Sequence, residues 1–197
     1  MGAWTAGWGG GEDDRFDPID EFNPDVVPPP GPFLSGHELL DGEEHVAFHR
    51  VTRSIFDRRG VFDMTFGYNL ARLNLDRHHS NAGFRYAIDR ARDDELRAEF
   101  TPTTPFCPQS HTLAIGSFRA WNLEADAHPY SLVRVRVAPM HHRSEVINDE
   151  LERLEVSYRR TGALEAEPPL GEYESTRRGD ASGGGRDDGI SGPGRRR

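Results

Sequence analysis

The chain has 197 residues, with 33 acidic side chains against 24 arginines, no lysine, and a formal net charge of −9. An acidic balance argues against nucleic acid as a ligand, because nucleic-acid-binding domains usually carry a basic patch. It is typical of an acidic, halophilic protein, whose charged surface stays soluble where salt screens charge strongly. A codon bias that removes lysine is the alternative explanation.

The sequence shows no sign of a membrane or secretory location. No apolar run approaches the length needed to cross a bilayer. The N-terminus lacks the basic region and apolar segment of a secretory signal. Cys107 is the only cysteine, so no disulfide can form within the chain, which fits a reducing compartment. We therefore expect a cytoplasmic protein that binds no membrane.

The two ends of the chain differ in composition from its middle. Residues 1–36 are rich in Gly, Pro and Asp and include Trp4 and Trp8, whereas residues 161–197 are rich in Gly, Ser, Arg and Asp. Such segments bury too little apolar surface to offset the entropy lost on ordering. We expect a disordered N-terminal arm (1–36), one domain (37–160) and a disordered C-terminal tail (161–197). The tryptophans could anchor the arm to a partner or to the domain.

The first element of the domain is a helix over about residues 42–58. Asp41 is followed three residues later by Glu44, which is the spacing of a capping box at a helix start, and Ser35 and Glu38 show the same spacing. Apolar residues repeat at helical spacing along one face of this segment: Ala47, Phe48, Val51, Ile55 and Phe56.

Two histidines of this helix, His45 and His49, lie one turn apart. That spacing can bind a metal ion. Two imidazoles alone make a weak metal site, however, and solvated helix histidines are more common. We therefore expect both side chains to face solvent.

Alternating apolar residues predict the strands that follow. The alternation changes register over residues 66–75, which predicts one strand with a bulge, or a short strand and a turn. Residues 84–88 and 96–100 alternate more regularly and predict an antiparallel hairpin. The second strand of this hairpin leads into the turn that contains Cys107.

A helix, a strand and a last helix complete the domain. Pro108 suits the first position of a helix over 108–121, because a helix start cannot use the N–H that proline lacks. Residues 133–137 alternate valine with arginine and predict a strand with one dry face. Ser144 can cap the last helix. Its apolar stripe contains Ile147, Leu151, Leu154 and Tyr158.

This order of elements predicts the fold class. One helix, three strands, a helix, a strand and a helix favour an α+β fold. We expect a small single-domain sandwich, with a mixed sheet and helices mainly on one of its faces, flanked by disordered termini.

Cys107 is the residue on which the functional prediction depends. It lies between the strand 96–100 and the following helix, in a turn stiffened by Thr101, Thr103, Pro105 and Pro108. A thiol at a helix start faces unpaired N–H groups and the positive end of the helix dipole, which favour the reactive thiolate. The alternative is a buried cysteine that serves only as a small apolar side chain.

The string Ala98-Glu-Phe-Thr-Pro-Thr-Thr-Pro-Phe-Cys107 resembles the signature of the SufT/PaaD-type iron–sulfur cluster maturation family. That family is related to subunits of the eukaryotic cytosolic iron–sulfur targeting complex. The segment from His142 to Leu151 also resembles the ending of these proteins, and the similarity covers about residues 40–158. It suggests accessory residues in that segment: His142, Ser144, Glu145 and Asn148. The chain departs from the family pattern after Asp57, where Arg58 and Arg59 stand in place of Pro-Glu.

The resemblance implies a role in assembling or delivering iron–sulfur clusters, with Cys107 as the reactive thiol and as a transient metal ligand. The implied partners are iron–sulfur assembly proteins and apo-client proteins. A stable cluster usually needs four thiolates, or two thiolates and two imidazoles. A homodimer is possible. One chain offers one thiol and such a dimer two, so we expect no permanently bound cofactor, only transient contact with iron or a cluster.

Two other functions remain open. The chain could be a non-catalytic module that binds a protein partner. The third and least favoured function is an enzyme that uses Cys107 as nucleophile with a histidine as base. The candidate bases are His111, which lies four positions after Cys107, and the adjacent His141 and His142. His111 is also a possible accessory residue of the Cys107 site.

Overall fold

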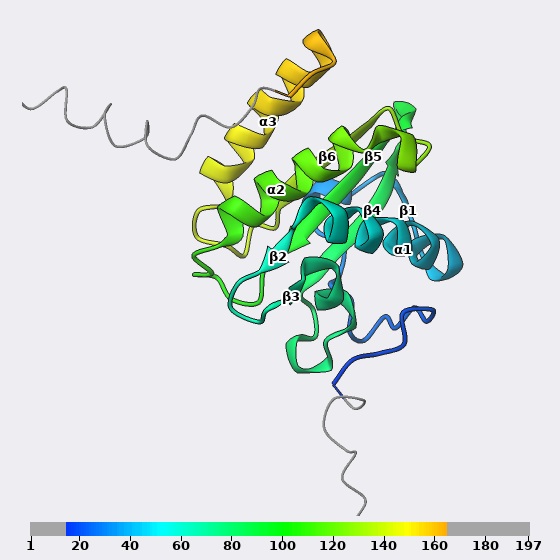
Figure 1. Cartoon of the computed structure of the whole chain (residues 1–197), viewed down its shortest axis with the longest axis vertical. Helices are drawn as coiled ribbons and strands as arrows, with labels where there is room; N and C mark the ends of the chain where they lie inside the picture. The colour runs from blue at the N-terminus through cyan, green and yellow to red at the C-terminus, as the bar shows by residue number, and fades with distance from the viewer. Residues whose placement is uncertain (1–14, 165–197) are drawn as a thin grey trace, which may run out of the picture. The chain divides into compact units, whose positions relative to one another are not determined.

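The computed structural model describes residues 15–164, which form a four-stranded sheet, a two-stranded hairpin and three α-helices (Figure 1). The main sheet has the order β1-β4-β5-β6 and contains β1 (Glu38–Leu39), β4 (Gly83–Asp89), β5 (Arg92–Thr101) and β6 (Leu132–Val137). β1 and β5 run antiparallel to β4, whereas β6 runs parallel to β5. A separate hairpin consists of β2 (Phe62–Asp63) and β3 (Tyr68–Asn69).

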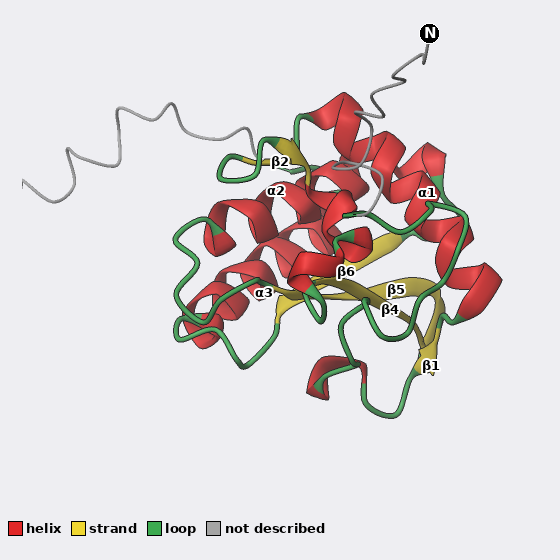
Figure 2. Cartoon of the chain, turned by 90° about the horizontal axis from the view of Figure 1, so that it is seen from below, coloured by secondary structure: helices red, strands yellow, loops and turns green. Residues whose placement is uncertain are grey.

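The α-helices are α1 (Gly42–Arg59), α2 (Ser110–Leu123) and α3 (Ser144–Thr161). Figure 2 shows α1 and α2 over one face of the sheet. Four short 3-10 helices connect the larger elements: η1 (Pro32–Leu34), η2 (Leu70–Leu75), η3 (Arg77–His79) and η4 (Ala125–Ala127). The predicted α+β class with a mixed sheet is thereby confirmed. None of the helices within residues 15–164 is long and apolar enough to cross a membrane.

The ends of α1 follow the charge rules for a helix. Glu43 and Glu44 lie in its first turn, Arg58 and Arg59 in its last, and Gly60 ends it in the left-handed conformation. The predicted helix over 42–58 is confirmed. Its N-cap residue is Asp41, but the carboxylate binds Arg85 at 2.5 Å and does not cap the helix. The same spacing at Ser35 and Glu38 starts no helix, because Glu38 pairs with β4.

Aromatic side chains fill the space between the helices and the sheet. Trp121 of α2 is fully buried, with its ring 4.9 Å from that of Phe56 and 5.2 Å from that of Phe84. Phe100 of β5 lies 5.0 Å from Phe84, so neighbouring strands contribute to one apolar layer. The alternation in β4, β5 and β6 thus turns one residue in two toward this core.

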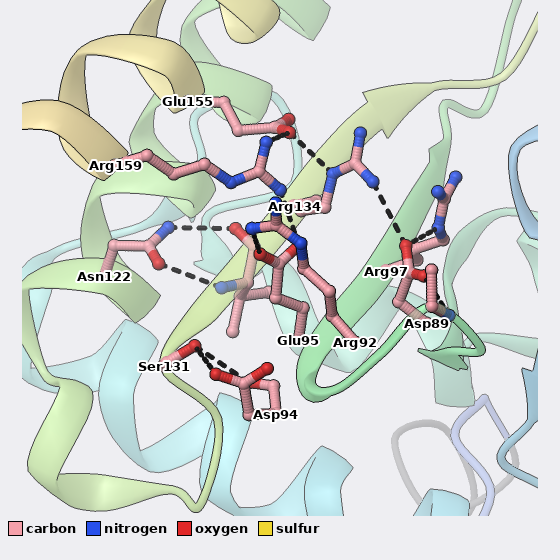
Figure 3. Close-up of polar contacts among 12 residues, drawn as sticks. Asp89, Arg92, Asp94, Glu95, Arg97, Asn122, Ser131, Arg134, Glu155 and Arg159 are labelled. Carbon is pink, nitrogen blue, oxygen red and sulfur yellow. Dashed lines mark hydrogen bonds and ion pairs between the residues drawn. The ribbon is translucent and has the colours of Figure 1, made fainter.

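The opposite face of the sheet carries charged side chains that bind one another (Figure 3). Glu155 of α3 is only 2% exposed and pairs with Arg134 at 2.6 Å, Arg136 at 2.9 Å and Arg159 at 3.0 Å. Arg134 also pairs with Asp89 at 3.1 Å. The valines of β6 therefore form the dry face that the sequence predicts, while its arginines join the sheet to α3.

The N-terminal segment is a correction to the prediction of a disordered arm over 1–36. Residues 15–36 pack on the domain, with Val26, Val27 and Leu34 buried. The ring of Phe33 lies 4.7 Å from the guanidinium of Arg97. Composition alone missed this because a few short apolar side chains suffice, and the prolines lower the entropy lost on ordering.

The outermost residues of both predicted termini are not described by the structure. Residues 1–14, which include Trp4 and Trp8, and residues 165–197 lie outside the described residues. At the other boundary, α3 ends at Thr161 and Leu164 packs against the core, so the domain continues slightly past the predicted limit of 160.

Of the two alternatives predicted for residues 66–75, the short strand followed by a turn is confirmed and the single strand with a bulge is wrong. Only Tyr68 and Asn69 form strand β3, and the 3-10 helix η2 follows at once. The side chain of Asn69 accepts a hydrogen bond from the N–H of Ala71, which starts the 3-10 turn. The leucines that suggested alternation are all buried, at 0%, 1% and 7% exposure, because η2 is covered on several sides: Leu70, Leu73 and Leu75.

His45 and His49 are buried rather than solvated, which corrects the second expectation for α1. Each is 3% exposed. His49 donates from Nε2 to the carbonyl of Ala71 and accepts at Nδ1 from the hydroxyl of Tyr86, both at 2.9 Å. Burial lowers the pKa of His49 to about 4 and that of His45 to about 2, so both are neutral at pH 7.

These buried histidines should make the fold sensitive to acid. The unfolded chain protonates each near the ordinary value of 6.5, whereas the folded chain does not protonate His49 until about pH 4. The unfolded state therefore binds more protons, and the free energy of unfolding should fall as pH drops from 6.5 to 4, by about 1.4 kcal/mol per pH unit for each histidine. Urea unfolding at a series of pH values measures the slope. His49→Gln, which can keep the bond to Ala71, should reduce the slope of the free energy of unfolding against pH. His78→Gln, at an exposed position, is the control and should leave that slope unchanged. An unchanged slope in His49→Gln would contradict this account.

The packing of the N-terminal segment can be tested at Gly31. The carboxylate of Glu99 is 2% exposed and accepts N–H groups of Phe33 and Gly31. A Cβ at Gly31 would lie 2.1 Å from Glu99 Oε1. Gly31→Ala should therefore lower the free energy of unfolding by about 1–3 kcal/mol. Gly116→Ala in α2, where nothing lies within 4 Å of the new Cβ, should be neutral or stabilising. Equal stability of the two variants would show that the segment is not held here.

Candidate functional site

The candidate site lies where β5 and β6 end. Because these strands are parallel and Phe100 pairs with Val137, the loops that follow them start at the same end of the two strands. The first loop contains Cys107, which is half-buried. The N–H of Cys107 donates to the carbonyl of Thr104 at 3.3 Å, and its own carbonyl accepts the N–H of Ser110 at 3.3 Å. Two successive turns therefore fix the backbone on both sides of the thiol.

The start of α2 differs from the prediction. The first helical residue is Ser110, so Pro108 precedes the N-cap residue Gln109 and does not occupy the first helical position. Cys107 consequently lies three residues before the helix. No side chain caps α2, because the amide of Gln109 binds elsewhere: it accepts the N–H of Met64 at 3.0 Å and donates to the hydroxyl of Thr65 at 2.6 Å. This contact holds the β2–β3 loop beside the Cys107 turn, as the neighbouring ribbons in Figure 1 show.

His141 holds the Cys107 peptide from the second loop. It is 3% exposed, and its Nδ1 accepts the N–H of Arg143 at 3.2 Å. Because Nδ1 accepts, Nε2 carries a proton and donates to the carbonyl of Cys107 at 3.1 Å. Both ring nitrogens are thus occupied by backbone groups.

His142 binds the same turn one peptide group earlier. Its backbone N–H and its Nδ1 both donate to the carbonyl of Pro105, at 3.0 and 2.8 Å. The ring packs 5.1 Å from that of Phe106. Together, His141 and His142 hold the carbonyls of residues 105 and 107, so the β6–α3 loop fixes the position of Cys107 from both sides.

The other residues suggested by the sequence are not gathered around the thiol by any described contact. His111 pairs with Glu150 at 2.8 Å on the exposed surface. Ser144 is the first residue of α3 and makes no capping hydrogen bond, which corrects its predicted role, and Glu145 is exposed in the first turn. Thr101 ends β5, and Thr103 lies partly buried in the turn.

Asn148 has a structural role that its place in the resemblance did not reveal. Its carboxamide accepts the N–H of Val137 at 2.7 Å and donates to the same residue's carbonyl at 3.0 Å. Asn122 makes the same pair of bonds with Val133, both at 2.9 Å. β6 is an edge strand, so these two amides satisfy backbone groups that another strand could otherwise bind.

Sequence reasoning missed the exposed apolar side chains around the turn. Phe106 is 72% exposed, Met64 81% and Met140 43%. Each stands in a stretch without formal charge, and the longest of these runs from residue 100 to residue 118. Because 29% of the residues in the chain are charged, a long uncharged stretch was the sequence feature that could have indicated this exposed apolar surface.

The geometry offers a thiol but no preformed metal centre in the described part of the chain. Between residues 15 and 164, no three His, Cys, Asp or Glu side chains are grouped so that they could hold a metal ion. None of the described side chains hydrogen-bonds the Cys107 sulfur.

Comparison with family models identifies one match, a domain of unknown function (DUF7998), over residues 14–165. The chain belongs to this family. Its limits coincide with the described domain and include the N-terminal segment that packs on the sheet. Comparisons with curated proteins and with solved structures find no match.

Asn148 provides a test that separates a structural role from a functional one. Asn148→Ala would leave the N–H and carbonyl of Val137 without partners, which should cost about 1–3 kcal/mol in the free energy of unfolding. Asp149→Ala at the exposed neighbouring position should change it by less than about 0.5 kcal/mol. Urea unfolding measures both. If Asn148→Ala kept full stability but altered the alkylation rate of Cys107, Asn148 would belong to the site.

Proposed function

We propose that this protein is an adaptor for iron–sulfur cluster assembly or delivery that acts through Cys107. The observation that carries the proposal is a partly accessible thiol, fixed by neighbouring loops, at the end of a string that resembles the SufT/PaaD-type signature. The cluster is cargo here, because one thiol per chain cannot complete its coordination. Transient handover to a client needs only that the thiol be exposed and held in place.

The departure from the family pattern at Arg58 does not weaken this proposal. Arg58 pairs with Glu124 at 3.1 Å, and Glu124 is the C-cap of α2. Cys107 precedes the other end of that helix, whose 14 residues span about 21 Å. Arg58, which stands in place of the family's proline, therefore joins α1 to the end of α2 that lies away from the thiol.

An enzyme with Cys107 as nucleophile is less well supported. Such catalysis needs a base within hydrogen-bond reach of the sulfur. Both nitrogens of His141 bind backbone groups, and His111 is paired with Glu150. His142 keeps Nε2 free, but its ring is directed by Nδ1 toward Pro105.

A non-catalytic binding module is the second candidate, because Phe106 and Met64 offer exposed apolar surface. The proposed adaptor would act in the cytoplasm with iron–sulfur assembly proteins and apo-client proteins. The two functions differ in one requirement: only the adaptor needs the sulfur atom.

Replacement of the thiol tests the proposal. Cys107→Ser should fold normally, because serine is nearly isosteric and the site is half-buried. In a strain that lacks the chromosomal copy, the variant should fail to restore iron–sulfur enzyme activities, while the client polypeptides accumulate as apo-proteins. Cys107→Ala should behave in the same way.

His111→Ala is the matched control, since it removes a nearby exposed side chain that the proposal does not use, and it should complement. Full complementation by Cys107→Ser, or normal cluster enzymes in the deletion strain, would refute the adaptor function and leave the binding module.

A further inference from the structure

Three loops form one exposed surface, here called the Cys107 face, which consists of Met64, Phe106, Cys107 and Met140. Hydrogen bonds show that these loops meet. Gln109 ties the loop of Met64 to the Cys107 turn, and His142, two residues after Met140, ties the β6–α3 loop to Pro105. The loops that carry the exposed thioethers and the phenyl ring therefore meet at the turn that contains the half-buried thiol.

The loop segments that carry the Cys107 face contain no formally charged residue. No Asp, Glu or Arg occurs in residues 64–71, 100–118 or 137–142, although the chain carries a net charge of −9. Depletion of charge together with aromatic and methionine side chains is typical of the centre of a protein–protein interface. Exposed apolar surface of this kind marks an interaction site.

We infer that the Cys107 face binds a second copy of this chain in a two-fold dimer, which brings the two Cys107 thiols together. This inference rests on the proposed function, which one thiol leaves incomplete. A two-fold interface uses the same patch on both subunits, so a residue near its axis meets its own equivalent. Two copies would then present two thiolates to one cluster, half of the usual set.

Charge selects this face for self-association. Two molecules that each carry a charge of −9 repel one another over most of their surfaces. An uncharged patch can meet its own copy without placing like charges opposite each other. The same argument would not favour a basic partner, which would bind the acidic surface elsewhere.

Side chains occupy part of the sheet's outer backbone groups, which limits self-association by strand addition. On β6, Asn122 and Asn148 occupy the outward backbone groups of Val133 and Val137. On the opposite side, β1 covers Ala87 and Ile88 of β4, and beyond β1 Asn74 binds both the N–H and the carbonyl of Phe84, each at 2.7 Å. Since the backbone groups at these positions are already paired, strand addition there is hindered.

Mild oxidation of the full chain tests the geometry. Diamide, an azo compound, takes up the two thiol hydrogens and becomes a hydrazine, while one S–S bond joins two Cys107 residues. Wild-type protein should form this covalent dimer at concentrations where sedimentation of the reduced protein already shows a dimer. Phe106→Glu and Met64→Glu place charges on the face and should weaken the reduced dimer by at least about tenfold, equivalent to 1.4 kcal/mol.

Val156→Glu is the matched control, because Val156 is 58% exposed on α3 outside the face. It should dimerise like the wild type, and Cys107→Ser should still form the reduced dimer. A monomer at all concentrations, or equal dimerisation of Phe106→Glu and Val156→Glu, would overturn the inference. Neither result depends on cluster chemistry, so a failed dimer and a failed complementation by the thiol variants are distinguishable outcomes.

Discussion

The parallel pairing of β5 with β6 is the contact on which the candidate site depends. Parallel strands need a crossover, and α2 provides it, so Cys107 lies at the entrance to that crossover. The same pairing delivers His141 and His142 to the carbonyls that flank the thiol. An antiparallel arrangement would have put the two loops at opposite ends of the sheet, and the turn would have lost its support.

β6 is an edge strand, and charged and amide side chains hold it in place. Glu155 is buried among three arginines. Removal of any one of them would leave the buried carboxylate incompletely paired and would lower the free energy of unfolding substantially. These pairs fix α3 against β6, while Asn122 and Asn148 pair its outer backbone groups. The polar side of the sheet thus positions the loop between β6 and α3, and through it the Cys107 turn.

The sequence allowed prediction of those elements whose signals are local. The helix 42–58, the hairpin and the dry face of β6 follow from periodicity, and the Cys107 turn follows from its prolines. Contacts between distant residues left no such pattern. The bond of Glu99 to Phe33 spans 66 residues and the bond of Gln109 to Met64 spans 45. For the same reason the packed N-terminal segment and the histidine contacts could not be foreseen.

The string that resembles the SufT/PaaD signature combines two kinds of residue. Ala98 and Phe100 point into the core, whereas Glu99, between them, faces the other side of the sheet and holds Gly31 and Phe33. These three residues are constrained by packing, whatever the protein does. Only beyond Thr101 does the chain leave the sheet and present Cys107 at the surface. A resemblance in the strand is therefore informative about fold, and any claim about function must depend on the turn, where no packing constraint requires sulfur.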